Sequence, residues 1–133
     1  PEEILAIIER EKINYLQIIG DAFARPILDA MREGAYDIST LKVISSGGAP
    51  LSSNYKEEFL ALLPGVLVVD GFGTSETGTQ GVNLATRDSG ASTGDFKPVN
   101  TTVVLSEDLT RLLEPSELEI GWLAQWPHSG RVL

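Results

Sequence analysis

An uninterrupted apolar run at residues 66–69 restricts the folds that this chain can adopt. Three of its four residues are valine, and it lies between Pro64-Gly65 and Asp70-Gly71, which favour turns. Apolar residues without alternation are typical of a strand buried on both faces, as parallel strands between helices are. We therefore expect a parallel sheet that helices cover.

The segments before this run show helix and strand patterns in turn. Residues 1–10 predict a helix and residues 13–19 a strand. Residues 21–33 predict a second helix, which Gly34 ends. Pro26 has no backbone N–H to donate, so we expect a kink or a late start there.

A second strand and a third helix follow the same pattern. Residues 41–45 predict a strand, and residues 46–50 a loop. Residues 54–63 predict a helix in which Asn54 and Glu57 fit a capping box. The order strand, helix, strand, helix, strand implies right-handed crossovers in one parallel sheet.

The amino-acid composition changes after the third predicted strand. Residues 77–98 are rich in small and polar side chains, which predicts mostly loop. Residues 101–105, 110–113 and 117–125 predict antiparallel strands, the first two joined by a turn at 106–108. The expected fold class is therefore α/β, a parallel sheet with flanking helices followed by a β-rich C-terminal segment.

Composition excludes several kinds of site. Nineteen acidic residues oppose ten basic ones, for a net charge of −9, whereas a nucleic-acid surface needs a basic stripe. The chain has no cysteine and one histidine, His128, which excludes disulfides, thiolate metal sites and paired-histidine clusters. No apolar run approaches the roughly 18 to 20 residues that span a bilayer. Neither nucleic acid nor a transmembrane segment is expected.

Two loops are predicted at the carboxyl ends of strands, where ligands bind in open parallel sheets. In residues 45–50, two glycines let the backbone approach a flat ligand, although an ordinary turn is the simpler interpretation. Residues 70–78 combine an aromatic ring, hydroxyls and two carboxylates, which suit a base, phosphate oxygens and Mg²⁺. A polar surface loop is the alternative, but it does not account for Phe72.

Two common phosphate motifs are absent. Gly71 and Gly73 are followed by Glu76 where a dinucleotide-binding motif has its third glycine. No Gly-x-x-x-x-Gly-Lys-Ser/Thr segment occurs either. A Rossmann dehydrogenase and a P-loop NTPase are thereby disfavoured.

Taken together, SGGAPL at 46–51 and DGFGTSE at 70–76 resemble the adenylate-forming superfamily of acyl-CoA synthetases, luciferases and peptide-synthetase adenylation domains. EPSELEIGWLA at 114–124 resembles a third family segment, with Ser116 and Leu118 where the family usually has glycine. GDAFARP at 20–26 is similar to the bacterial fatty-acyl branch, the fatty-acyl-CoA synthetases.

The resemblance implies a reaction in two steps and a place in a larger protein. A carboxylate attacks the α-phosphate of ATP to form an acyl-adenylate, and coenzyme A then displaces AMP. Residues 1–133 would be a fragment of the AMP-binding N-terminal domain, with an α/β portion at 1–76, a loop-rich portion at 77–99 and a β-rich portion at 100–133. The abrupt ends of the sequence agree with a piece of a larger soluble protein.

The resemblance also implies roles for individual residues. Nucleotide binding would fall to Gly47, Gly48, Ala49, Pro50, Asp70, Gly71, Phe72, Gly73, Thr74 and Ser75. Within this set, Asp70 would bond the adenine amino group, and Phe72 would stack on the ring where the family usually has tyrosine. Ser75, in place of a family threonine, and Glu76 would be catalytic, with Ser75 at the α-phosphate and Glu76 holding Mg²⁺. Residues 78–83 would line an acyl tunnel.

Other family elements would lie outside these residues. The family's phosphate loop precedes residue 1, and its ribose-binding aspartate and catalytic lysine follow residue 133. Thr93-Gly94-Asp95 spells the ribose motif, but it comes before the segment at 119–121 that the true motif follows. We therefore assign Asp95 no catalytic role.

The implied function is a cytoplasmic, AMP-forming acyl-CoA synthetase of lipid metabolism. Its ligands would be ATP, Mg²⁺, coenzyme A and a hydrophobic carboxylic acid, either a long-chain fatty acid or a steroid side-chain acid. A homo-oligomer is left open, and the isolated chain is expected to be inactive. One alternative is a fatty acyl-AMP ligase, and another is a non-catalytic α/β interaction module.

Overall fold

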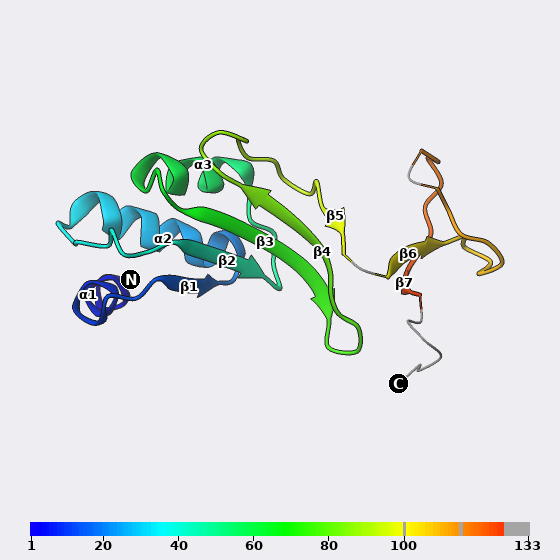
Figure 1. Ribbon diagram of the computed structural model, residues 1–133, viewed down its shortest axis with the longest axis horizontal. Helices are drawn as coiled ribbons and strands as arrows, with labels where there is room; N and C mark the ends of the chain where they lie inside the picture. The colour runs from blue at the N-terminus through cyan, green and yellow to red at the C-terminus, as the bar shows by residue number, and fades with distance from the viewer. Residues whose placement is uncertain (100, 115, 127–133) are drawn as a thin grey trace.

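The computed structural model describes residues 1–99, 101–114 and 116–126 (Figure 1). Two residues discussed above, Pro115 in the third family-like segment and His128, lie outside these ranges. The described elements, in chain order, are α1 (Glu2–Glu11), β1 (Tyr15–Ile18), α2 (Gly20–Glu33), β2 (Val43–Gly47), α3 (Ser53–Leu62), β3 (Leu67–Thr74), β4 (Gly78–Ala85), β5 (Lys97–Pro98), β6 (Thr102–Leu105) and β7 (Trp122–Gln125).

Five strands form one sheet in the order β1-β2-β3-β4-β5. The pairs β1–β2 and β2–β3 are parallel, whereas β3–β4 and β4–β5 are antiparallel. Strands β6 and β7 form a separate antiparallel pair, at the far end of the molecule from α1 (Figure 1). The predicted fold class, a parallel sheet with flanking helices followed by a β-rich segment, is confirmed.

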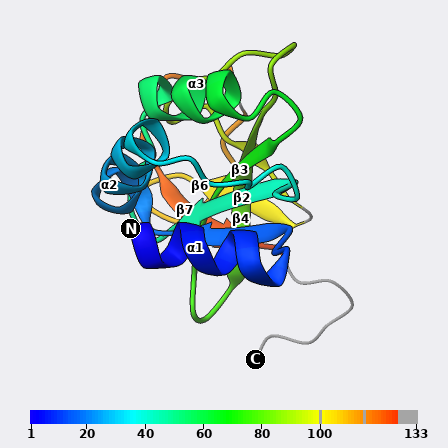
Figure 2. The same cartoon turned by 90° about the vertical axis from the view of Figure 1, so that its left-hand side faces the viewer.

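The three helices form one layer against the sheet. Helix α2 contacts both α1 and α3, and it lies between them in Figure 2. One hydrophobic core joins the helices to the strands through Leu5, Ile8, Ile18, Ala24, Ile27, Leu28, Ile44, Phe59, Leu60 and Val68. Burial of these side chains, at about 1.5–3 kcal/mol for each large one, is what holds the layers together.

Of the two outcomes predicted for Pro26, the late start is wrong and the kink stays a prediction, and the predicted capping box of α3 is wrong. Helix α2 begins at Gly20, so Pro26 lies inside the helix and does not delay its start. The buried residues Ala24, Ile27 and Leu28 surround that position, and their packing outweighs the missing hydrogen bond. Helix α3 begins after Ser52, and no side chain caps it, so the capping box of Asn54 and Glu57 does not form.

Strand β3 is longer than predicted, and its second half carries the DGFGT segment that we expected in a loop. The strand is not buried on both faces, because Val68 is buried whereas Leu67 and Val69 are half-buried. Strand β2 is shifted toward its C-terminus relative to the predicted range 41–45, so Ser46 and Gly47 also belong to a strand.

The prediction of mostly loop over 77–98 is wrong for β4. Strand β4 folds back on β3 in a hairpin, with a β-bulge between Phe72 and Gly73. Glycine and asparagine lower the strand propensity of β4, but the ladder to β3 satisfies its backbone groups. The alternation of Val82 and Leu84 with polar or small neighbours is the signal that indicates this strand.

The β-rich C-terminal segment forms fewer strands than predicted. Strand β6 agrees with the prediction for 101–105, and its partner is β7, which is shorter than the predicted 117–125. Residues 110–113 contribute only an isolated bridge between Leu105 and Leu112. The turn after β6 forms as predicted, with the Leu109 N–H donating to the Ser106 carbonyl at 2.9 Å.

Candidate functional site

The two family-like segments lie side by side although about two dozen residues separate them in the sequence. Strands β2 and β3 are parallel neighbours, and their register pairs Ser46 with Asp70 and Gly47 with Gly71. The chain leaves β2 after Gly47 and forms the loop that leads to α3. The loop and the second half of β3 therefore meet at the carboxyl end of the parallel strands, as the sequence predicted.

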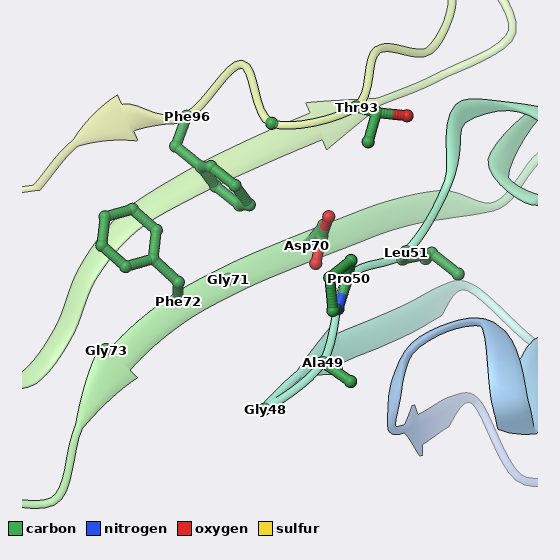
Figure 3. Close-up of a pocket in the computed structure, with 11 residues that line it drawn as sticks. Gly48, Ala49, Pro50, Leu51, Asp70, Gly71, Phe72, Gly73, Thr93 and Phe96 are labelled. Carbon is green, nitrogen blue, oxygen red and sulfur yellow. The ribbon is translucent and has the colours of Figure 1, made fainter.

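A pocket of about 470 Å³ lies where these two segments meet (Figure 3). It is lined by Gly48, Ala49, Pro50, Leu51, Asp70, Gly71, Phe72, Gly73, Thr93, Gly94 and Phe96. Most of the residues predicted to bind a nucleotide are in this set. We call it the first pocket.

Phe72 and Phe96 form an aromatic pair in the first pocket. Their ring centroids lie 4.9 Å apart at an interplanar angle of 72°, an edge-to-face contact (Figure 3). The Phe72 ring also lies over Gly81 of β4, where an added Cβ would come within 2.2 Å of the ring. Phe72 is thus held between a ring and a backbone, and its side chain is only partly exposed.

Asp70 is almost fully buried, and its carboxylate pairs with a lysine. Lys56 of α3 is 0% exposed, and its Nζ lies 2.9 Å from Asp70 Oδ2. The same ammonium donates to Asn83 Oδ1 at 3.0 Å and to the Ser92 carbonyl at 2.8 Å. Three acceptors therefore surround the buried Lys56 Nζ, so each of its N–H donors has a partner.

Lys56 is a residue that the sequence analysis missed. A signal for it exists, because Lys56 shares the buried face of α3 with Phe59 and Leu60 at the spacing of one helical turn. A lysine on the apolar face of a helix requires a buried acceptor. Its partner Asp70 lies on another element, so only the fold identifies the pair.

The segment after β4 forms a second wall of the first pocket. Asn83 donates through Nδ2 to the Ser92 hydroxyl at 2.9 Å and to the Asp95 carbonyl at 2.8 Å. These bonds hold Thr93 and Gly94 over the pocket, whereas Asp95 lines a different depression. Sequence reasoning missed Thr93, Gly94 and Phe96, because buried bonds from other elements determine where this segment lies. That Asp95 has no catalytic role stays a prediction.

A second pocket of about 550 Å³ adjoins the first and shares Gly48, Gly71, Phe72 and Gly73 with it. It contains the remaining residues predicted to bind the nucleotide, Gly47, Thr74 and Ser75. Of the range 78–83, predicted to line an acyl tunnel, Gly78, Thr79 and Val82 line this second pocket. Gln80 and Asn83 are instead buried elsewhere.

Glu76 lies at the exposed tip of the β3–β4 hairpin and lines neither pocket. Thr74 and Thr77 hold the tip through a hydroxyl–hydroxyl bond of 2.9 Å. Within the described ranges no three histidine, aspartate or glutamate side chains gather to hold a metal. A single carboxylate still fits Mg²⁺, which takes most of its ligands from phosphates and water.

Solved structures share this fold. A luciferase-like enzyme from the mealworm Zophobas morio superposes with a TM-score of 0.67 at 20% identity, over 87% of this chain and 29% of its own. A long-chain-fatty-acid-CoA ligase from Archaeoglobus fulgidus gives a TM-score of 0.67 at 20% identity, over 88% of this chain and 26% of its own. This chain therefore has the fold of a part of each of these two enzymes.

The sequence comparison identifies the family. The model of the family described as AMP-binding enzyme matches residues 1–121. The chain belongs to the AMP-binding enzyme family.

Two curated relatives are similar over most of this chain. The medium-chain acyl-CoA ligase Mig of Mycobacterium avium is 41% identical over 124 residues, which are 93% of this chain and 22% of that protein. A 3-oxocholest-4-en-26-oate–CoA ligase of Rhodococcus rhodochrous is 36% identical over 129 residues, 92% of this chain and 23% of that protein. The chain thus spans less than a quarter of the length of these relatives.

Among the described residues, none of the helices combines the length and the apolar character needed to cross a membrane.

Proposed function

We propose that this chain supplies the adenine-binding and Mg²⁺-binding side of the active site of an AMP-forming acyl-CoA ligase. The observation that carries the proposal is the first pocket, in which the loop after β2, Asp70 and the Phe72 ring surround one space of about 470 Å³. A purine ring needs a flat slot with an aromatic face and a few placed polar groups.

Each group of the first pocket has a use in this proposal. The backbone of Gly48 and Ala49 would lie against one face of the adenine and the Phe72 ring against the other. The Asp70 carboxylate, whose Oδ2 accepts from Lys56, would accept the hydrogen bond of the adenine amino group. A base with a carbonyl oxygen in place of that amino group would face a carboxylate and be rejected.

The hairpin tip would serve the phosphates. The Ser75 hydroxyl, at the rim of the second pocket, would donate to the α-phosphate. The exposed carboxylate of Glu76 would hold Mg²⁺, which supplies charge stabilisation to the phosphate oxygens when bound. The tip has room for a polyphosphate, because Ser75 and Glu76 are both exposed.

The second pocket would receive the reacting end of a hydrophobic carboxylic acid. It adjoins the first pocket at Gly48, Gly71 and Phe72, so an acid there would lie next to the nucleotide. The names of the relatives, a medium-chain acyl-CoA ligase and a steroid-acid–CoA ligase, support a medium- or long-chain fatty acid or a steroid side-chain acid. Coenzyme A would accept the acyl group, and the cytoplasm would be the compartment.

An assay of the whole protein with ATP, Mg²⁺ and a panel of acids tests this function. We expect acid-dependent exchange of pyrophosphate into ATP, and thioester formation when coenzyme A is added. Exchange without thioester would identify a fatty acyl-AMP ligase instead. If no acid supports exchange and AMP does not bind, the alternative of a non-catalytic interaction module would be favoured. The 133 residues alone are expected to form no thioester.

A further inference from the structure

The GDAFARP segment at residues 20–26 has no role in the site described so far. It begins where β1 ends and forms the first half of α2. Neither Gly20 nor Asp21 lines the first or the second pocket. Both residues nevertheless contact the loop between β2 and α3, whose residues 48–51 line the first pocket.

Gly20 contacts this loop at its start and along its length. Its N–H donates to the buried Ser46 hydroxyl at 3.0 Å, just before the loop leaves β2. Its φ is +55°, and a Cβ added there would lie 2.6 Å from the Pro50 carbonyl oxygen and 2.8 Å from the Ala49 Cβ. Both the backbone conformation and the close approach require glycine.

Asp21 contacts the end of the same loop. Its N–H donates to the Pro50 carbonyl at 3.1 Å. Its carboxylate accepts the Ser52 N–H at 2.7 Å and the Ser52 hydroxyl at 2.5 Å. Ser52 is the residue before α3, so the Asp21 charge also lies near the positive end of that helix dipole.

These contacts together hold the loop from one side. Ser46 precedes the pocket-lining residues 48–51 and Ser52 follows them, so the loop is attached at both ends and at Pro50 between them. A loop with a glycine at its start has many open conformations, and attachment at several points removes most of them before a ligand arrives.

We infer that Gly20 and Asp21 are positioning residues, which hold the loop of residues 48–51 in the conformation that binds the ligand of the first pocket. The identity of that ligand, an adenine nucleotide, rests on the proposed function. The attachment of the loop does not depend on it.

The test compares Asp21→Ala with Asp29→Ala in the whole protein. Asp29 lies on the same helix and forms an exposed ion pair with Arg32, so it is the matched control. Hydrogen exchange of the amides at 47–52 reports the loop, and the dissociation constant of AMP reports the pocket. We expect exchange about tenfold faster and AMP binding about tenfold weaker in Asp21→Ala, with no change in Asp29→Ala.

A second variant keeps the test decisive if Asp21→Ala unfolds. Ser52→Ala removes one hydroxyl and leaves the helix intact, so it is expected to show a smaller change of the same kind. The double variant Asp21→Ala/Ser52→Ala is expected to bind AMP no more weakly than Asp21→Ala alone, because the bond that Ser52→Ala removes is already absent in Asp21→Ala.

The outcomes separate this inference from the proposed function. Unchanged exchange at 47–52 in both folded Asp21→Ala and Ser52→Ala would overturn the inference. Faster exchange confined to 47–52, in a protein whose wild type binds no AMP, would support the positioning role and overturn the nucleotide assignment. Faster exchange throughout α2 as well would show a structural role only, and would also overturn the inference.

Discussion

The Lys56 ammonium and the Asp70 carboxylate form an ion pair 2.9 Å long, with side chains 0% and 4% exposed. The pair joins α3 to β3 directly behind the first pocket, on whose wall Asp70 lies. A buried charge that loses its partner is costly, whereas a buried pair with further hydrogen bonds is tolerated. The side chain proposed to recognise a base is therefore tied to the stability of the fold.

Lys56→Met tests how much this ion pair contributes to the stability of the fold and to nucleotide binding. The substitution leaves the Asp70 charge buried without its cation, and we expect the free energy of unfolding to fall by about 3–5 kcal/mol. Denaturant titration measures this loss. AMP affinity is expected to fall as well, because the carboxylate loses the group that orients it.

Asp70→Asn in the Lys56→Met background is the matched control. It removes the uncompensated charge, so it is expected to recover at least about 1 kcal/mol of stability while AMP affinity stays low. Stability of Lys56→Met within about 0.5 kcal/mol of wild type would contradict the assignment of the pair.

Glu76→Ala tests the proposed Mg²⁺ ligand. Because the side chain is exposed at a hairpin tip, the change in unfolding free energy is expected to stay within about 0.5 kcal/mol. Exchange of pyrophosphate into ATP is expected to disappear in the whole protein. Glu107→Ala, an exposed acid in the turn after β6, is expected to leave exchange unchanged. Near-normal exchange by Glu76→Ala at saturating Mg²⁺ would disprove the ligand.

Gly81→Ala tests whether the position of the Phe72 ring matters. The new methyl group would meet the ring at 2.2 Å, so the ring must leave the place where we propose that it stacks on adenine. We expect the dissociation constant of AMP to rise about tenfold, as for the loss of part of a base–aromatic stack. Gly65→Ala is the control, since nothing lies within 4 Å of its added Cβ. Equal affinities in the two variants would refute the stacking role.

The Asp37 carboxylate predicts a pH dependence of stability. Hydrogen bonds from the Ser39 hydroxyl and Lys12, with the Lys12 charge, lower the pKa of Asp37 from 3.8 to about 2. A lowered pKa means that the folded state binds the proton less readily than the unfolded state. The resulting stability is present above about pH 4 and is lost as pH falls toward 2.

Asp37→Asn is therefore expected to be less stable than wild type at pH 6, and the difference is expected to shrink as pH falls through about 2. Denaturant titrations across this range measure the difference. Carboxyl titration followed by nuclear magnetic resonance gives a direct check. A midpoint at the ordinary value of 3.8 would show that the pair with Lys12 and Ser39 does not form in solution.

Some helices and strands could be predicted from the sequence, and others could not. Helix α1 and strand β6 agree with local patterns, because periodicity and turn residues act within a few positions. Strand β4 was missed because its glycines and asparagine resemble a loop and outweigh the short alternation at Val82 and Leu84, whereas pairing with β3 satisfies its backbone. The strand expected at 110–113 is reduced to the bridge between Leu105 and Leu112, with the Leu113 N–H donating to the Val104 carbonyl of β6.

The candidate site likewise has features that the sequence predicts and features that only the fold determines. The motifs at 46–51 and 70–76 and the family could be identified from residue types and their spacing, because each motif is contiguous. The pairing of Lys56 with Asp70 could not, nor could the placement of Thr93 and Phe96 over the pocket. These depend on buried polar groups that must find partners on other elements, and only the folded chain determines which partners are near.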